Sequence, residues 1–90
     1  MSVKMVEHDF FITLLDCRCV YDTIDDKRKV YEWLVENFGG RMPYLGYSHW
    51  LQKNERWAVQ DNFRLYDGKG EFSVFFYDKL DYVAFKLRWL

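Results

Sequence analysis

The final twenty residues of the chain, Glu71 to Leu90, change from one hydrophobic period to another. From Phe72 to Tyr77 the apolar residues of one face recur at every second position, which predicts a β-strand. After Asp78 the apolar residues follow one helical stripe instead: Leu80, Val83, Ala84, Leu87 and Leu90. Asp78 is of a type that caps helices, so we expect a closing helix that buries this stripe. The alternative is a final strand, with alternate residues from Asp81 to Trp89 pointing inward.

Three other stretches are predicted to be extended. Phe10 to Tyr21 is apolar on both alternating faces, which indicates a central strand after a short polar lead, residues 1–7. Trp57–Val59 and Phe63–Tyr66 have strand composition as well. The sequence DGKG, Asp67 to Gly70, then supplies the turn of a hairpin into the last strand, because aspartate and glycine favour turn conformations. A phosphate-binding loop is a weaker interpretation, since a strand rather than a helix follows the glycines.

A helix is predicted from Ile24 to Phe38. Thr23 and Asp26 resemble a capping box at its start, and Gly39 supplies the left-handed residue at its end. The expected inward stripe consists of Ile24, Val30, Tyr31, Leu34 and Phe38. The charged run from Asp25 to Lys29 is then expected to be a solvated face, which makes a catalytic carboxylate pair a poor hypothesis there.

Gly40 to Arg56, here called the ring-rich segment, is the least regular part of the chain. It holds the only proline, Pro43, and a concentration of rings at Tyr44, Tyr47, His49 and Trp50. Long irregular segments in small domains are often functional. The rings either form an exposed contact surface or fold back as a lid over the sheet, and Leu51–Gln52 is a candidate for short extended pairing.

These elements predict one α+β domain spanning residues 1–90. We expect a single small antiparallel sheet with two helices on one face, in the order β-α-(β)-β-β-α. This order is that of a truncated ferredoxin-like fold, without its final strand. The open face of the sheet would carry Phe75, Tyr77 and Tyr66.

Composition narrows the function. Aromatic residues make up 21% of the chain, more than a small core can hide, so some rings should be exposed at a contact surface. The formal net charge is −1, which argues against a strong electrostatic attraction to nucleic acid. No apolar run reaches the roughly 18 to 20 residues that cross a bilayer, and the first residues lack the apolar core of a signal peptide. We therefore expect a cytoplasmic protein without membrane partners.

The residue pattern supports no catalytic or metal site. Cys17 and Cys19 are too close for an unstrained disulfide and are expected to be free thiols. Only His8 and His49 offer imidazole, and neither stands in a metal-ligand or catalytic motif. We expect no enzyme activity, no metal and no cofactor.

The order of elements resembles that of RNA-recognition domains, which stack bases on rings of their sheet. In this chain Glu71 and Ser73 occupy the two stacking positions of the third-strand signature. Single-stranded nucleic-acid binding through the open aromatic face is therefore the alternative function and not the leading one.

The C-terminal segment has a second resemblance. Its matching residues are Phe76, Tyr77, Asp78, Asp81, Phe85, Lys86, Leu87, Arg88 and Trp89. The segment is similar to the endings of small uncharacterised accessory proteins of tailed bacteriophages, in which an aromatic strand runs into a closing helix. The resemblance implies a small protein made in the host bacterial cytoplasm that binds or inhibits a host factor.

The leading hypothesis is a small non-enzymatic protein-binding module with an unidentified protein partner. Its expected contact residues are Tyr44, Tyr47, His49, Trp50, Tyr66, Phe75 and Tyr77, because rings predominate in interface hot spots. A homodimer that buries the same rings between two copies is the alternative assembly.

Overall fold

The computed structural model describes residues 4–7, 15–46, 48–64 and 70–89. It describes their side chains too, except those of residues 4–7, 63 and 64. Within these residues the chain forms five strands and two helices. In chain order they are β1 Lys4–Glu7, β2 Leu15–Tyr21, α1 Ile24–Phe38, β3 Gln52–Lys53, β4 Trp57–Arg64, β5 Gly70–Phe76 and α2 Lys79–Trp89.

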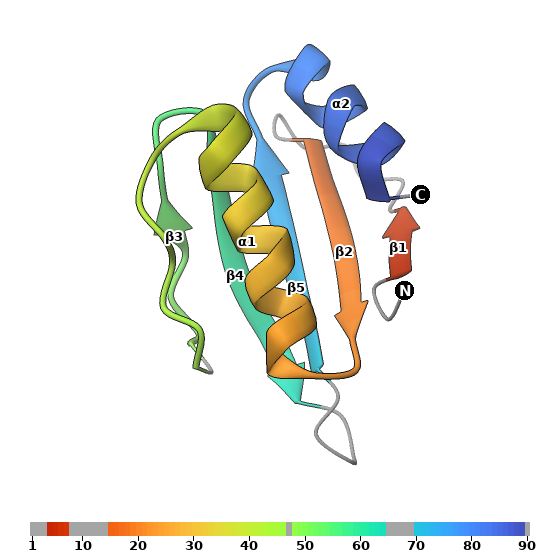
Figure 1. Ribbon diagram of the computed structural model, residues 1–90, viewed down its shortest axis with the longest axis vertical. Helices are drawn as coiled ribbons and strands as arrows, with labels where there is room; N and C mark the ends of the chain where they lie inside the picture. The colour runs from red at the N-terminus through yellow and green to blue at the C-terminus, as the bar shows by residue number, and fades with distance from the viewer. Residues whose placement is uncertain (1–3, 8–14, 47, 65–69, 90) are drawn as a thin grey trace.

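The strands form one sheet in the order β1-β2-β5-β4-β3, and each neighbouring pair is antiparallel. Both helices lie on the same face of this sheet (Figure 1). The predicted α+β class, with its antiparallel sheet and two helices on one face, is confirmed. The truncated ferredoxin-like prediction agrees with the central strands: β2 and β4, on either side of α1 in the chain, run parallel with β5 between them, which is the split βαβ arrangement. The two edge strands, β1 beside β2 and β3 beside β4, were not part of that prediction in this form.

Two strand predictions change at their boundaries. The polar lead contains β1, which pairs with β2 and so places β2 inside the sheet, as expected for a central strand. The two predicted strands Trp57–Val59 and Phe63–Tyr66 belong to one strand, β4, whose register shifts between Asp61 and Phe63. The first part of the Phe10–Tyr21 prediction and most of the DGKG turn fall outside the described residues.

Helix α1 begins and ends where the sequence predicts. The Thr23 hydroxyl accepts the backbone N–H of Asp26 at 3.2 Å, and the Asp26 carboxylate accepts the Thr23 N–H at 3.2 Å, which completes the capping box. Gly39, with φ of 77°, ends the helix. Its carbonyl accepts the Trp57 indole N–H at 2.9 Å, so a core side chain of β4 fixes the end of α1.

The buried face of α1 differs from the prediction at two positions. Ile24 is 43% exposed, whereas Lys27 is fully buried even though it stands in a charged run. Val30, Tyr31 and Leu34 are buried as expected. The charged run is therefore not a uniformly solvated face, because Lys27 reaches a carboxylate on the sheet.

The core lies between the sheet and the helices. Its sheet side comes from alternate residues of three strands: Cys17, Cys19, Tyr21, Trp57, Val59, Phe72, Val74 and Phe76. Tyr31 of α1 meets the Phe72 ring edge-on, with ring centroids 5.3 Å apart. Such pairs contribute about 0.5–1.5 kcal/mol beyond the area they bury. Aromatic packing thus connects α1 directly to the middle of the sheet.

The closing helix is confirmed, but it buries a different face from the one predicted. Asp78 caps α2 by accepting the Leu80 N–H at 2.8 Å. The buried residues are Asp81, Phe85 and Trp89, whereas Leu80 and Leu87 are 77% and 76% exposed. The predicted apolar stripe, over its described residues 80–87, therefore points away from the core.

Two sets of contacts explain the orientation of α2. Phe85 packs on Phe76 and Trp33, with centroids 5.2 and 5.9 Å away, and Trp89 also meets Trp33. Aromatic side chains bury about 150–250 Å² each, more than the competing leucines offer. Arg56 adds a bidentate pair, donating Nε to Asp81 Oδ2 at 3.0 Å and Nη2 to Oδ1 at 2.6 Å. An aromatic face and an ion pair thus decide the rotation of the helix.

This orientation predicts opposite outcomes for two residues of the same helix. Phe85→Ala should lower the free energy of unfolding by about 3–5 kcal/mol, because it leaves a cavity among aromatic rings. Leu87→Ala should change that free energy by less than about 0.5 kcal/mol, because the side chain is solvated. Urea unfolding followed by circular dichroism measures both. A larger loss for Leu87→Ala than for Phe85→Ala would restore the stripe predicted from the sequence.

Candidate functional site

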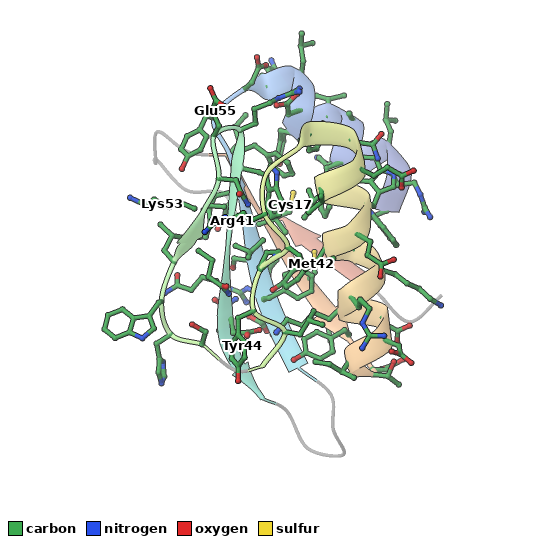
Figure 2. The ribbon with its side chains drawn as sticks, turned by 60° about the vertical axis from the view of Figure 1, so that its left-hand side comes forward. Cys17, Arg41, Met42, Tyr44, Lys53 and Glu55 are labelled. Carbon is green, nitrogen blue, oxygen red and sulfur yellow. The ribbon has the colours of Figure 1, made fainter. Side chains whose placement is uncertain are left out.

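The first part of the ring-rich segment, residues 40–46, lies alongside β3, which belongs to the same segment. The side-chain amides of Gln52 in β3 and of Asn54 just after it hydrogen-bond to the backbone of this part, as a neighbouring strand would. The Tyr44 N–H donates to Gln52 Oε1 at 2.6 Å, and the Arg41 N–H donates to Asn54 Oδ1 at 2.8 Å. Each amide also donates back, to the carbonyls of Tyr44 and Arg41 at 3.5 and 3.3 Å. The exposed first part of the segment therefore has a fixed backbone path between α1 and β3 (Figure 2).

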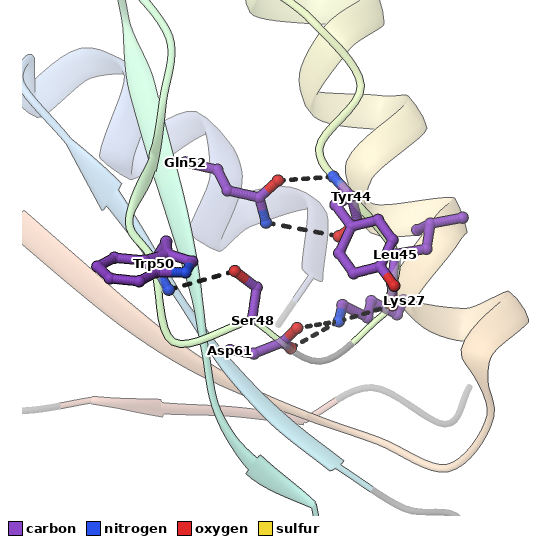
Figure 3. A network of polar contacts seen from close by, with 7 residues as sticks. All are labelled: Lys27, Tyr44, Leu45, Ser48, Trp50, Gln52 and Asp61. Atoms are coloured by element: carbon purple, nitrogen blue, oxygen red, sulfur yellow. Dashed lines mark hydrogen bonds and ion pairs between the residues drawn. The ribbon is translucent and has the colours of Figure 1, made fainter.

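A buried ion pair supports the same segment from beneath. Lys27 Nζ lies 2.6 Å from both carboxylate oxygens of Asp61 and donates to the Leu45 carbonyl at 3.1 Å (Figure 3). Lys27 is 0% exposed and Asp61 is 3% exposed. The ammonium also lies 5.4 and 5.6 Å from the Tyr21 and Tyr31 ring centroids, where cation–π attraction adds to the pairing. One lysine of α1 thus connects β4 with the ring-rich segment.

Large side chains project from this supported backbone. Tyr44 is 66% exposed and Trp50 is 80% exposed. The Trp50 N–H donates to Ser48 Oγ at 3.2 Å, and Gln60 donates to the His49 carbonyl at 2.5 Å. The backbone beside the exposed rings is therefore held by hydrogen bonds. Figure 3 shows Trp50 and Tyr44 to either side of Ser48, so a partner that covers both rings must extend across the segment.

Whether a residue of the ring-rich segment is exposed or folds onto the core depends on its position in the segment. Pro43 is buried, and Leu45 is partly buried against the core. Between and beyond them, Met42 and Tyr44 are exposed, and so is Trp50. The segment is thus anchored by Pro43 and Leu45, whereas its described rings face solvent.

The structure does not bring all the predicted contact residues together. Tyr44, His49 and Trp50 lie exposed on the ring-rich segment, Tyr77 is 47% exposed just after β5, and Phe75 is half-buried on the outer sheet face. Tyr47 and Tyr66 lie outside the described residues. The described candidates therefore separate into a cluster on the ring-rich segment and two rings at and after the end of β5.

The outer face of the sheet is polar where the sequence suggested an aromatic surface. Arg18 of β2 forms an ion pair with Glu71 of β5 at 2.9 Å. Asn62 of β4 donates to Glu71 at 3.2 Å and to Ser73 at 2.8 Å. Among the outward positions whose side chains the structure describes, Phe75 is the one ring. The described part of this face thus carries a cross-strand hydrogen-bond network around Glu71.

Within the ring-rich segment, a hollow of about 180 Å³ opens between residues 41–43 and residues 52–54. Its lining residues are Arg41, Met42, Pro43, Gln52, Lys53 and Asn54. Two of them are cationic and none is acidic. The hollow has the size and charge to accept a single acidic or polar side chain of a partner next to Tyr44. Sequence reasoning did not find it, because it depends on how residues 41–43 lie against β3.

The two thiols are poor nucleophiles. Cys17 and Cys19 are fully buried, and Cys17 points into the interior behind α1 (Figure 2). Burial, followed by the charge of Asp16, raises the pKa of Cys17 from 9.0 to about 12, although a hydrogen bond with Tyr82 opposes this rise. Burial also raises the pKa of Cys19 well above its usual value. Both groups are neutral thiols at physiological pH, which disfavours attack on a substrate.

Removing the buried ammonium should be costly. Lys27→Met leaves the Asp61 carboxylate buried without its cation and should lower the free energy of unfolding by about 3–5 kcal/mol. Lys27→Met combined with Asp61→Leu should recover most of that loss, because no buried charge remains. Urea titrations of the two variants and the wild type measure the difference. Equal losses in the single and double variants would mean that packing, and not charge, is what Lys27 contributes.

The thiols predict a fall in stability at high pH. A group whose pKa is raised on folding stabilises the protein below its unfolded value, here 9.0, and this contribution is lost as pH rises further. Tyr31 and Tyr82 also have raised pKa values and act in the same direction at higher pH, so the thiol effect should appear first. Urea midpoints are measured between about pH 8 and pH 10. They should fall more steeply with pH for the wild type than for a Cys17→Ala/Cys19→Ala variant. Parallel curves would contradict the assignment.

Comparison with protein-family models, curated proteins and solved structures gives no match to this chain. Among the described residues no helix has the length and apolarity to cross a membrane, and no three potential ligands gather into a metal site. The evidence for a function is therefore the exposed side chains of Tyr44 and Trp50 and the hydrogen bonds that hold their backbone.

Proposed function

We propose that this chain is a small non-enzymatic protein-binding module. Its contact surface is the exposed side of the ring-rich segment, with Tyr44 and Trp50 as anchors. The observation that carries the proposal is the combination of two large solvated rings with a backbone that is fixed beneath them. Gln52 holds the peptide of Tyr44 on both sides, and Ser48 accepts the N–H of Trp50.

Rigid aromatic anchors favour binding for two reasons. Each ring offers a large apolar area with few rotatable bonds, and tyrosine and tryptophan predominate among interface hot spots. A loop that is already ordered loses little conformational entropy on association. Lys27 serves this order, because it donates to the Leu45 carbonyl at the base of the segment. The cationic hollow beside Tyr44 adds a place for one acidic side chain.

The C-terminal resemblance to bacteriophage accessory proteins extends the proposal to a partner. It supports a host protein, met in the host bacterial cytoplasm and inhibited or redirected by binding. The proposal assigns no catalytic step to the chain. No observation on the described sheet face favours the nucleic-acid alternative.

Capture experiments test the contact surface. The immobilised protein should retain a partner from bacterial lysate, and Trp50→Ala and Tyr44→Ala should each weaken that partner's affinity at least tenfold, about 1.4 kcal/mol or more. Ile24→Ala is the matched control, because it removes a solvated apolar side chain from α1, outside the ring-rich segment. Circular dichroism should show the same fold in all three variants, since the three side chains are exposed.

The other readings give different results in the same experiments. Loss of the fold in Trp50→Ala or Tyr44→Ala would mean that the ring-rich segment belongs to the core. Binding of short single strands that persists at about 50 mM salt and weakens as salt increases would favour the nucleic-acid alternative. Light scattering at twice the monomer mass, reversed by Trp50→Ala, would assign the rings to a homodimer.

A further inference from the structure

Helix α2 presents an apolar ridge to solvent. Leu80 and Leu87 are 77% and 76% exposed, and Val83 between them is 40% exposed. Their spacing of three and then four residues places them in one line on the helix face opposite Phe85. Ala84 is exposed beside the ridge, and its small side chain leaves room for a facing residue. Exposed apolar side chains arranged in a row, and not scattered singly, are typical of an interaction surface.

Positive charge borders this ridge. Lys79 and Lys86 lie along one side of it, as their helical positions require, whereas Arg88 lies farther round the helix, one heptad after Asp81. The guanidinium of Arg88 is 4.1 Å from the Trp89 ring centroid, and Lys86 Nζ is 5.2 Å from that of Tyr82. These rings hold the two cations near the helix, which lowers the entropy lost when the cations are paired.

The acidic residue of α2 does not offset this charge at the surface. Asp81 is 6% exposed and lies on the core side of the helix, paired with Arg56. Within the described part of α2, the solvated side chains are therefore apolar or basic. The ridge and its cations form a second surface near the edge of the sheet opposite the ring-rich segment (Figure 1).

The charges select among occupants. A second copy of the chain would place lysines against lysines along an antiparallel helix pair, since Lys79 and Lys86 occupy equivalent flanking positions seven residues apart. Like charges at flanking positions oppose association. A partner helix with aliphatic residues on its seam and carboxylates beside it would instead pair with these cations and fill the ridge.

We propose that the outer face of α2, with Leu80, Val83 and Leu87 as its ridge, docks an acidic amphipathic helix of another protein. The mode is helix against helix, with side chains of the partner interleaving around Ala84. The ridge spans about 10 Å at 1.5 Å per residue, so it engages roughly two turns of the partner. An interface of that size belongs to the weak, transient class.

A designed peptide pair tests this proposal. The first peptide is a stapled amphipathic helix of about two heptads with leucine on its seam and glutamate at the flanking positions, and the second carries lysine in place of glutamate. Isotope-labelled protein is titrated with each and followed by amide chemical shifts. The acidic peptide should shift α2 resonances with a Kd in the micromolar to millimolar range, and the basic peptide should bind at least tenfold more weakly.

Variants of the protein sharpen the result. Leu80→Glu and Leu87→Glu should abolish binding of the acidic peptide, while the fold is kept because both side chains are solvated. Lys79→Glu combined with Lys86→Glu should reverse the preference between the two peptides, because both lysines beside the ridge are then acidic. Trp50→Ala should leave peptide binding unchanged, so that the outcome is independent of the ring-rich segment.

The proposal would be overturned by equal binding of both peptides, or by no binding of the acidic peptide at about 1 mM. Amide shifts confined to residues away from α2, or binding that survives Leu87→Glu, would overturn it as well. A dimer by light scattering that Leu87→Glu dissolves would assign the ridge to a second copy. Sedimentation with vesicles of anionic lipid, lost in Leu87→Glu and without any peptide binding, would assign it to a membrane surface.

Discussion

The buried ammonium of Lys27 is the interaction on which the arrangement of this protein most depends. It is the point where three separate parts of the chain meet, because it pairs with Asp61 of β4 and donates to Leu45 of the ring-rich segment. A buried charge is costly unless its hydrogen-bonding capacity is met. The observed packing of α1 therefore requires both the sheet and the ring-rich segment, since each supplies a partner for the ammonium. This requirement specifies one arrangement, although an apolar residue at the same position would also fill the space.

Much of the fold could be predicted from the sequence because local chemistry and tertiary packing agree. The capping box and the terminal glycine of α1 can be recognised in the sequence itself, so the limits of the helix follow from Thr23 and Gly39. The strand pattern of Phe72, Val74 and Phe76 is equally local, and all three are fully buried. Strand β1 could not be found in this way, because a short polar run becomes a strand only through pairing with β2.

The wrong predictions share one physical cause. A sequence pattern gives the periodicity of a helix or strand, but it does not show which residues of other elements pack against it. Lys27 stands among charged residues, and the sequence gives no sign that Asp61 lies opposite it. Helix α2 carries two faces that could be buried, one aliphatic and one built around Phe85 and Trp89. The choice between them depends on Trp33, Phe76 and Arg56, which come from other elements. Similarly, Tyr44 and Trp50 were found as rings in an irregular segment, but the amide bonds that order their backbone depend on the path of the folded chain.

The two exposed surfaces are connected through one residue. Arg56 closes the ring-rich segment, its guanidinium lies 5.0 Å from the Phe38 ring centroid, and its bidentate bond to Asp81 fixes the first turn of α2. Without that bond, the Asp81 carboxylate would be buried without its cation, so the core-facing side of α2 would be destabilised relative to its aliphatic side. The face that α2 shows to solvent therefore depends on the seating of the segment that carries Tyr44 and Trp50. A partner that displaced Arg56 would disturb both surfaces, whereas one that covered only the rings would leave the ridge of α2 in place.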